Sequence, residues 1–150
     1  MGDFLAALAA AGVEVVADVR ALPLSRRPGF SKSTLAASLA EAGIGYAHFR
    51  ALGTPSEGRA AARRHDHATL ERIYAGQLEL PEAMVAMAAL ADLAESSCLK
   101  MHGLMLSSRP GLLYWNPATI ACLHRVREMR ASGIPVFFTV DAGPQVKAVC

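Results

Sequence analysis

One carboxylate, Asp141, stands where an expected strand gives way to a turn. The run before it, residues 136–140, is β-branched and aromatic and predicts a buried strand. The Ala-Gly-Pro that follows predicts a turn. A carboxylate held at such a strand end is well placed for catalysis. An aspartate there also accepts hydrogen bonds from turn N–H groups, and spacing alone favours this structural role.

A second candidate site consists of four cations, Arg20, Arg26, Arg27 and Lys32. They follow an expected strand and precede or open an expected helix. Basic side chains and free helix N–H groups at the carboxyl end of a strand suit a phosphate or a carboxylate. We therefore predict that these residues bind a small phosphorylated or anionic ligand. A solvated basic loop paired with acidic neighbours is the alternative, and the pattern does not decide between the two.

The histidines predict surface or packing positions. His65 and His67 flank Asp66, but residues i and i+2 of a helix point to different faces. This spacing favours a polar surface over a shared metal site. His102 and His124 are isolated in the sequence. We expect His102 to be a packed histidine of a helix, without a chemical role.

The cysteines and the neighbouring aromatics also have ordinary interpretations. Cys98, Cys122 and Cys150 are widely spaced, and the sequence has no CxxC or Cys/His pair with metal-ligand spacing. We predict reduced cytosolic thiols and no metal site. Tyr114 and Trp115 are more typical of packing than of a platform that stacks nucleic acid bases.

Composition restricts the class of protein. The chain has 150 residues, of which 53 % are hydrophobic, so it can bury the core of one globular domain. No run approaches about 18 uninterrupted apolar residues, so we expect no membrane span and a cytoplasmic protein. The net charge of +2 is too small to indicate binding of nucleic acid. The sequence leaves the ligand and the oligomeric state open.

Hydrophobic periodicity predicts the elements that position these residues. Strands are expected at 13–19, 44–49 and 135–141, with 145–150 at an edge. Ser31 is expected to cap the second helix. We predict an α/β fold with a small, largely parallel three- to four-stranded sheet covered by helices. The expected helices span residues 1–11, 32–42, 57–76, 81–95 and 117–131, with a continuation of the fourth over 99–106 as an alternative.

The C-terminal motifs carry a family resemblance. The patterns MH-x-LML-x-S-x-P, YWNP and FT-x-DAGP resemble the C-terminal part of diphosphomevalonate decarboxylases, members of the GHMP kinase superfamily. The resemblance covers residues 100–150. It implies that Asp141 is the catalytic carboxylate, which faces the tertiary hydroxyl of the substrate while ATP phosphorylates it. Loss of phosphate and carbon dioxide then gives isopentenyl diphosphate.

The same family binds ATP through a loop rich in Gly, Ser and Ala in its N-terminal half. This chain has no counterpart of that loop. Phosphoryl transfer requires positioning and charge neutralisation, which one carboxylate does not supply. We therefore expect no cofactor for the isolated chain, and ATP and Mg are implied only by resemblance to the full-length decarboxylase.

The N-terminal motifs resemble a different family. DVRALPLSRRPGFSK, AGIGYAHFRALGTPSEGR and the IYA near Ile73 resemble the uncharacterised DUF488 family over residues 1–95. The usual opening strand of the form TIGHS and the usual closing strand are not found. The resemblance favours a site among Arg20, Arg26 and Arg27 and names no ligand.

A shift in charge supports a junction between the two resemblances. Residues 1–95 carry 9 basic and 11 acidic side chains, whereas residues 96–150 carry 6 basic and 2 acidic ones. We predict a single composite α/β domain over 1–150, with a DUF488-like part and a decarboxylase-like part.

Three functional interpretations follow from the two parts. They are a decarboxylase remnant built on Asp141, a DUF488-type enzyme or binding domain for a small ligand, and a non-catalytic product of fusion, truncation or sequence assembly. We expect the third for activity, so that the chain alone is inactive. The first gives the most specific chemical label, because its motifs name a reaction.

Overall fold

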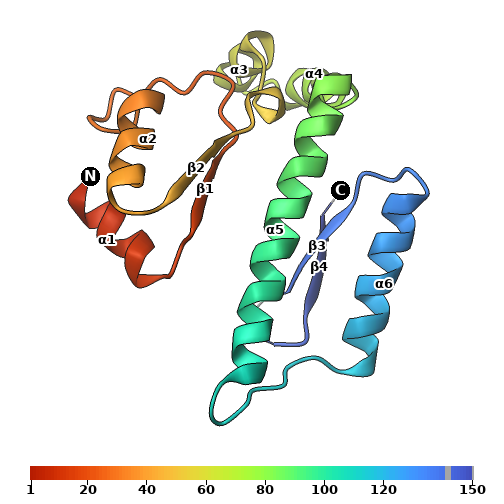
Figure 1. The fold of residues 1–150 in the computed structure, drawn as a ribbon. Helices are drawn as coiled ribbons and strands as arrows, with labels where there is room; N and C mark the ends of the chain where they lie inside the picture. The colour runs from red at the N-terminus through yellow and green to blue at the C-terminus, as the bar shows by residue number, and fades with distance from the viewer. Residues whose placement is uncertain (141–142, 150) are drawn as a thin grey trace. The chain divides into compact units, whose positions relative to one another are not determined.

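The computed structural model describes residues 1–140 and 143–149, and it is an α/β structure (Figure 1). Contacts divide the chain into two compact units, Met1–Ala86 and Met87–Cys150. The division falls within α5 (Pro81–Ser107), so one helix contributes residues to both units. The prediction of a single composite domain stays a prediction.

The N-terminal unit is built on a parallel strand pair. β1 (Val15–Asp18) pairs with β2 (Gly45–His48), and the connection between them contains α2 (Lys32–Glu41). Parallel neighbours need such a crossover, and it is commonly a helix. The two strands and their parallel pairing confirm the predicted strands 13–19 and 44–49.

The core of this unit lies on one face of the strand pair. α1 (Gly2–Ala10) and α2 supply apolar side chains to a cluster around Leu39, which is fully buried. Val16 and Tyr46 point to this cluster, whereas Val15 on the other face is exposed. Alternation along β1 therefore directs every second side chain to the helices, as the strand repeat requires.

The helical region predicted over 57–76 is two helices. α3 (Ser56–Arg63) and α4 (His67–Leu78) are separated by a turn in which His65 has φ of 58°. The side chain of Asp66 accepts a hydrogen bond from the backbone N–H of Thr69 and caps α4. His65 and His67 are exposed, as the predicted polar surface requires. A short 3₁₀ helix, η1 (Arg50–Leu52), precedes this pair.

The C-terminal unit is a hairpin packed on two helices. α5 runs for 27 residues, through the alternative continuation over 99–106, and α6 spans Pro117–Ala131. β3 (Phe137–Val140) pairs antiparallel with β4 (Val146–Val149). The core of the unit surrounds Phe138, which is fully buried, and its other members are Cys98, Leu123, Val126, Val136 and Val140.

The strand arrangement corrects one prediction. Within residues 1–140 and 143–149, the strands form two sheets of two strands each rather than one largely parallel sheet of three to four. Only a short segment of the chain, 141–145, separates β3 from β4, and such spacing favours an antiparallel hairpin. Pairing β3 with β1 would require closure of a much longer loop, which costs more conformational entropy.

Candidate ligand-binding site

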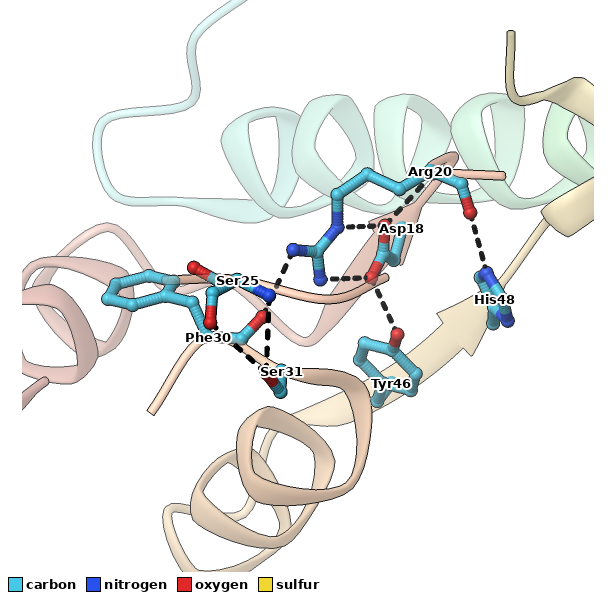
Figure 2. A network of polar contacts seen from close by, with 7 residues as sticks. All are labelled: Asp18, Arg20, Ser25, Phe30, Ser31, Tyr46 and His48. Carbon is cyan, nitrogen blue, oxygen red and sulfur yellow. Dashed lines mark hydrogen bonds and ion pairs between the residues drawn. The ribbon is translucent and has the colours of Figure 1, made fainter. Parts of the chain in front are cut away.

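A buried carboxylate organises the carboxyl end of β1 (Figure 2). Asp18 is 6 % exposed, and its Oδ1 accepts hydrogen bonds from the backbone N–H and the Nε of Arg20 at 3.0 and 2.8 Å. Its Oδ2 accepts from Arg20 Nη2 and from the Tyr46 hydroxyl, each at 2.6 Å. Both carboxylate oxygens are therefore satisfied, which is what a buried charge requires.

This arrangement fixes the protonation states of the acid and the phenol. The hydrogen bond from Arg20 holds the pKa of the Asp18 carboxyl well below its usual range, against the opposing effect of burial. Burial, followed by the hydrogen bond to Asp18, raises the pKa of Tyr46 to about 12. Asp18 is therefore a carboxylate and Tyr46 a neutral donor throughout the physiological range.

We expect alkali to weaken the N-terminal unit through Tyr46. Its folded pKa of about 12 lies above the ordinary 10, so its contribution is complete below pH 10 and is lost as the pH rises through 12. The free energy of unfolding should fall by about 1–2 kcal/mol over this interval, after allowance for partial exposure. Denaturant titrations of wild type, Tyr46→Phe and the control Tyr114→Phe measure it. A fall of equal size in Tyr46→Phe would contradict the assignment.

Two of the four predicted cations, Arg20 and Arg27, contact Phe30. Nη1 of Arg20 donates to the carbonyl of Phe30 at 3.0 Å, so its guanidinium ties the loop after β1 to Asp18. Arg26 and Arg27 are exposed, and the guanidinium of Arg27 lies 5.2 Å from the centre of the Phe30 ring. Lys32 is the exposed first residue of α2. Their role in ligand binding stays a prediction.

Ser31 occupies the predicted N-cap position of α2 but makes a different bond. Its hydroxyl accepts a hydrogen bond from the backbone N–H of Ser25 at 3.2 Å, and no side-chain cap of the helix forms. Figure 2 shows this contact beside the Asp18 network, together with His48, whose Nε2 lies 2.9 Å from the carbonyl oxygen of Arg20. Both contacts restrict the loop between β1 and α2.

A cleft of about 670 Å³ opens among the segments that follow β1 and β2. Its polar side chains come from the 3₁₀ helix and from helix ends, and they are Arg50, Ser56, Arg59, Gln77 and Glu82. Arg59 is held by a hydrogen bond from Nη1 to the Thr54 carbonyl at 2.6 Å. Gln77 donates to the Ala51 carbonyl at 2.9 Å. Ligands of open α/β sheets commonly bind at this position, beyond the carboxyl ends of the strands.

The remaining wall of the cleft is apolar or backbone, and it consists of Ala21, Leu22, Ala51, Gly53 and Pro55. Gly53 makes the closest approach. A Cβ on this residue would collide with the backbone N of Ala21 and would lie 2.6 Å from the carbonyl oxygen of Val19. The loops after β1 and β2 therefore touch only because residue 53 has no side chain.

Backbone donors add to the positive character of the cleft. α3 begins beside it at Ser56, and no side chain caps the free N–H groups of its first turn. Such a turn favours an anion. Among the described residues, neither Arg50 nor Arg59 has a carboxylate at ion-pair distance. Guanidinium groups without a carboxylate at ion-pair distance can form charge-assisted hydrogen bonds with the phosphate or carboxylate of a ligand.

Sequence reasoning missed this cleft because Arg59 lies in the predicted helix 57–76 and Arg50 lies outside every predicted element. A signal was present in RALGTPSEGR, residues 50–59, where two arginines bracket a Gly-Thr-Pro-Ser turn. Proline followed by Ser-Glu is typical of a helix start. A helix beginning there places both arginines near its first turn.

Asp141 lies outside the described residues, but the strand before it is well anchored. The backbone N–H of Val140 donates to the Cys98 sulfur at 3.3 Å, and Nε2 of His102 lies 3.1 Å from the Val140 carbonyl oxygen. His102 is 3 % exposed and packs on the Trp115 ring, as its predicted packing role requires. The end of β3 is therefore held by α5.

In residues 1–140 and 143–149, His, Cys, Asp and Glu side chains form no group of three or more that could hold a metal ion. In the same residues, no helix combines the length and the hydropathy needed to cross a bilayer.

The fold and the cleft define an α/β unit with a ligand-sized cavity beyond a parallel strand pair. The chain belongs to the DUF488 family, described as a domain of unknown function, whose sequence model matches residues 1–107. This confirms the N-terminal resemblance and extends it from residue 95 to the last residue of α5.

Comparisons with individual proteins find similarity to decarboxylases. The phosphomevalonate decarboxylase of Haloferax volcanii is 36 % identical over 56 residues, which are 37 % of this chain and 17 % of that protein. A solved structure of the mevalonate diphosphate decarboxylase from Enterococcus faecalis is 31 % identical, with a TM-score of 0.39. The similarity covers 66 % of this chain and 29 % of that one.

A structure of MDDEF in complex with MVAPP has a TM-score of 0.39 and 26 % identity. The similarity covers 84 % of this chain and 32 % of that one. The chain therefore spans less than a fifth of the curated relative and about a third of these solved proteins.

Proposed function

We propose that the N-terminal unit binds a small anionic or phosphorylated ligand in the cleft beyond β1 and β2. The observation that carries this proposal is the placement of Arg50 and Arg59 on the cleft, with no carboxylate at ion-pair distance among the described residues. The uncapped first turn of α3 supplies further donors to the same anion. The DUF488 family itself names no ligand, so the proposal rests on this geometry.

The net charge of the cleft limits its affinity for an anion. Two arginines and Glu82 leave its side chains with a net charge of +1, which favours a single anionic group. Because the cleft is open to water, solvent screens each pair and limits its contribution. We expect inorganic phosphate to bind with a Kd of about 1 mM, equivalent to roughly 4 kcal/mol.

Titration with inorganic phosphate, followed by amide NMR, tests the site. We expect shifts in residues 50–59 and at Ala21 and Leu22, which line the cleft. The double variant Arg50→Ala, Arg59→Ala should weaken binding about tenfold or more, because charge-assisted hydrogen bonds are lost. Shifts that persist unchanged in this variant would exclude the cleft.

The matched control is Arg26→Ala, Arg27→Ala, which removes the same charge from the loop where the sequence predicted the site. This variant should keep the phosphate shifts, because neither residue lines the cleft. The opposite result, with binding lost only in the loop variant, would return the site to Arg26 and Arg27, with Arg20 and Lys32 as their proposed neighbours.

We also propose that the chain joins parts of two families and that its C-terminal part has no decarboxylase activity alone. The 36 % identity to a phosphomevalonate decarboxylase supports this second relationship. Positioning of reactants can lower a barrier by about 7–11 kcal/mol, and it depends on groups that bind ATP and substrate together. A general base by itself contributes only about a hundred- to ten-thousand-fold.

We therefore expect no release of carbon dioxide from diphosphomevalonate and ATP by this chain. Radiometric or coupled assays of wild type and Asp141→Asn should both match the buffer blank. Turnover by wild type that disappears in Asp141→Asn would instead establish a decarboxylase. Resequencing of the gene across residues 90–105 tests whether the joined sequence is genuine.

A further inference from the structure

We propose that the ligand of the cleft has two parts, one anionic group and one compact apolar group. This inference rests on the proposed function and deepens it by naming the class of ligand. The anionic group lies between Arg50 and Arg59, and the apolar group lies on Leu22. A monosubstituted phosphate or a carboxylate with a short hydrocarbon or aromatic substituent has this form.

The exposure of Leu22 is the first reason. Its side chain is 55 % exposed although it lies on the wall of a cleft, and Ala21, Ala51 and Pro55 extend the apolar surface around it. An inorganic anion held by the arginines would leave this surface in water. An apolar substituent would remove it from water, which is favourable in proportion to the area buried.

The size of the cleft is the second reason. A volume of about 670 Å³ falls in the range of about 300–1,000 Å³ that is typical of sites for small organic molecules. Such sites are lined mainly by apolar groups, with a few polar ones that fix orientation. The cleft has this mixture of apolar and polar groups. A phosphate ion alone would fill only a fraction of the space.

The charge of the cleft limits the anionic part to one group. Glu82 lies on the cleft with the two arginines, and its carboxylate would repel a chain of several phosphates. Glu82 can also accept a hydrogen bond from a hydroxyl or amino group of the ligand. The expected ligand is therefore a small amphipathic monoester or acid rather than a nucleoside triphosphate.

A comparison of inorganic phosphate with phenyl phosphate tests the inference on the full chain. Phenyl phosphate should bind about tenfold more tightly, which corresponds to removal of roughly 55 Å² of apolar surface from water. The variant Leu22→Asn should reduce this ratio to about one, because the apolar contact is lost, and the ratio cancels any effect of the variant on phosphate binding itself. The control is Leu24→Asn, because Leu24 belongs to the same loop, is 70 % exposed and does not line the cleft. It should keep the tenfold ratio.

The possible results separate this inference from the proposed function. Equal affinities for the two probes in wild type would overturn the two-part ligand and leave the anion site standing. A preference for phenyl phosphate that survives in Leu22→Asn but is lost in Leu24→Asn would also overturn it, because the apolar contact would then lie outside the cleft. Failure of both probes to bind would overturn the proposed function and this inference together.

Discussion

Replacing Gly53 with alanine is expected to destabilise the N-terminal unit by about 3 kcal/mol, the upper end of the range for overpacking. Residue 53 has φ of −82° and ψ of 146°, a conformation open to any residue, so the cost is steric rather than conformational. The added Cβ would meet backbone atoms of Val19 and Ala21, which cannot rotate away as a side chain can. A drop in Tm of about 12–24 °C follows for a unit of this size.

Circular dichroism melts of Gly53→Ala and Gly76→Ala measure this effect. Gly76 lies inside α4, and a Cβ there meets nothing within 4 Å, so this control should be neutral or more stable by up to about 1 kcal/mol. A melt of Gly53→Ala within a few degrees of wild type would show that the two loops do not touch. Loss of phosphate binding should accompany the lower Tm, because Gly53 also lines the cleft.

Replacing Phe138 with aspartate is expected to unfold the C-terminal unit at room temperature. Phe138 is 0 % exposed at the centre of the cluster between α5, α6 and β3. Loss of a buried phenylalanine costs about 3–5 kcal/mol, and a buried charge without a dedicated partner adds several more. The sum approaches the total stability of a typical domain, about 5–15 kcal/mol.

The fluorescence of Trp115 reports this change, because it is the sole tryptophan and packs against the Phe138 cluster. Its emission should shift toward that of a solvated indole in Phe138→Asp. The control Val149→Asp changes a residue of β4 that is 40 % exposed and should cost only about 1 kcal/mol. An unchanged Trp115 emission in Phe138→Asp would contradict the assigned core.

Trp115 also tests the predicted single domain. If residues 1–150 unfold as one cooperative domain, Gly53→Ala should lower the Trp115 transition together with the circular dichroism melt. If the units unfold separately, the Trp115 transition should stay at its wild-type temperature, because residue 53 and Trp115 belong to different units. Either outcome settles the organisation of the chain.

Local sequence patterns predicted the elements well where short-range chemistry decides them. Gly12 and Gly43 follow α1 and α2 with φ of 65° and 74°, and glycine is the residue that ends a helix in this conformation at least cost. Pro117 opens α6, and the Asn116 side chain caps it, so the predicted helix 117–131 is confirmed. These signals depend on neighbours within a few residues.

The pairing of distant strands and the partners of side chains were harder to predict from the sequence. The sequence placed Arg20 at the strand end, but the strength of its attachment to Asp18 depends on burial and on Tyr46 from another strand. The cleft arises because Gly53 lets two loops meet, and no periodicity encodes that approach. The pairing of β3 with β4 rather than with β1 is likewise not encoded in strand composition, and the shorter loop between β3 and β4 favours it.

The unbroken course of α5 restricts which changes of length its sequence tolerates. Its buried positions in the C-terminal unit are Ala91, Glu95, Cys98 and His102, which recur at intervals of three or four residues. This stripe passes through residue 96, where the charge of the sequence changes. Each residue rotates a helix by about 100°, so an insertion of one residue there would turn Cys98 and His102 away from β3. Insertions or deletions at this point are therefore tolerated only in phase with the helical repeat.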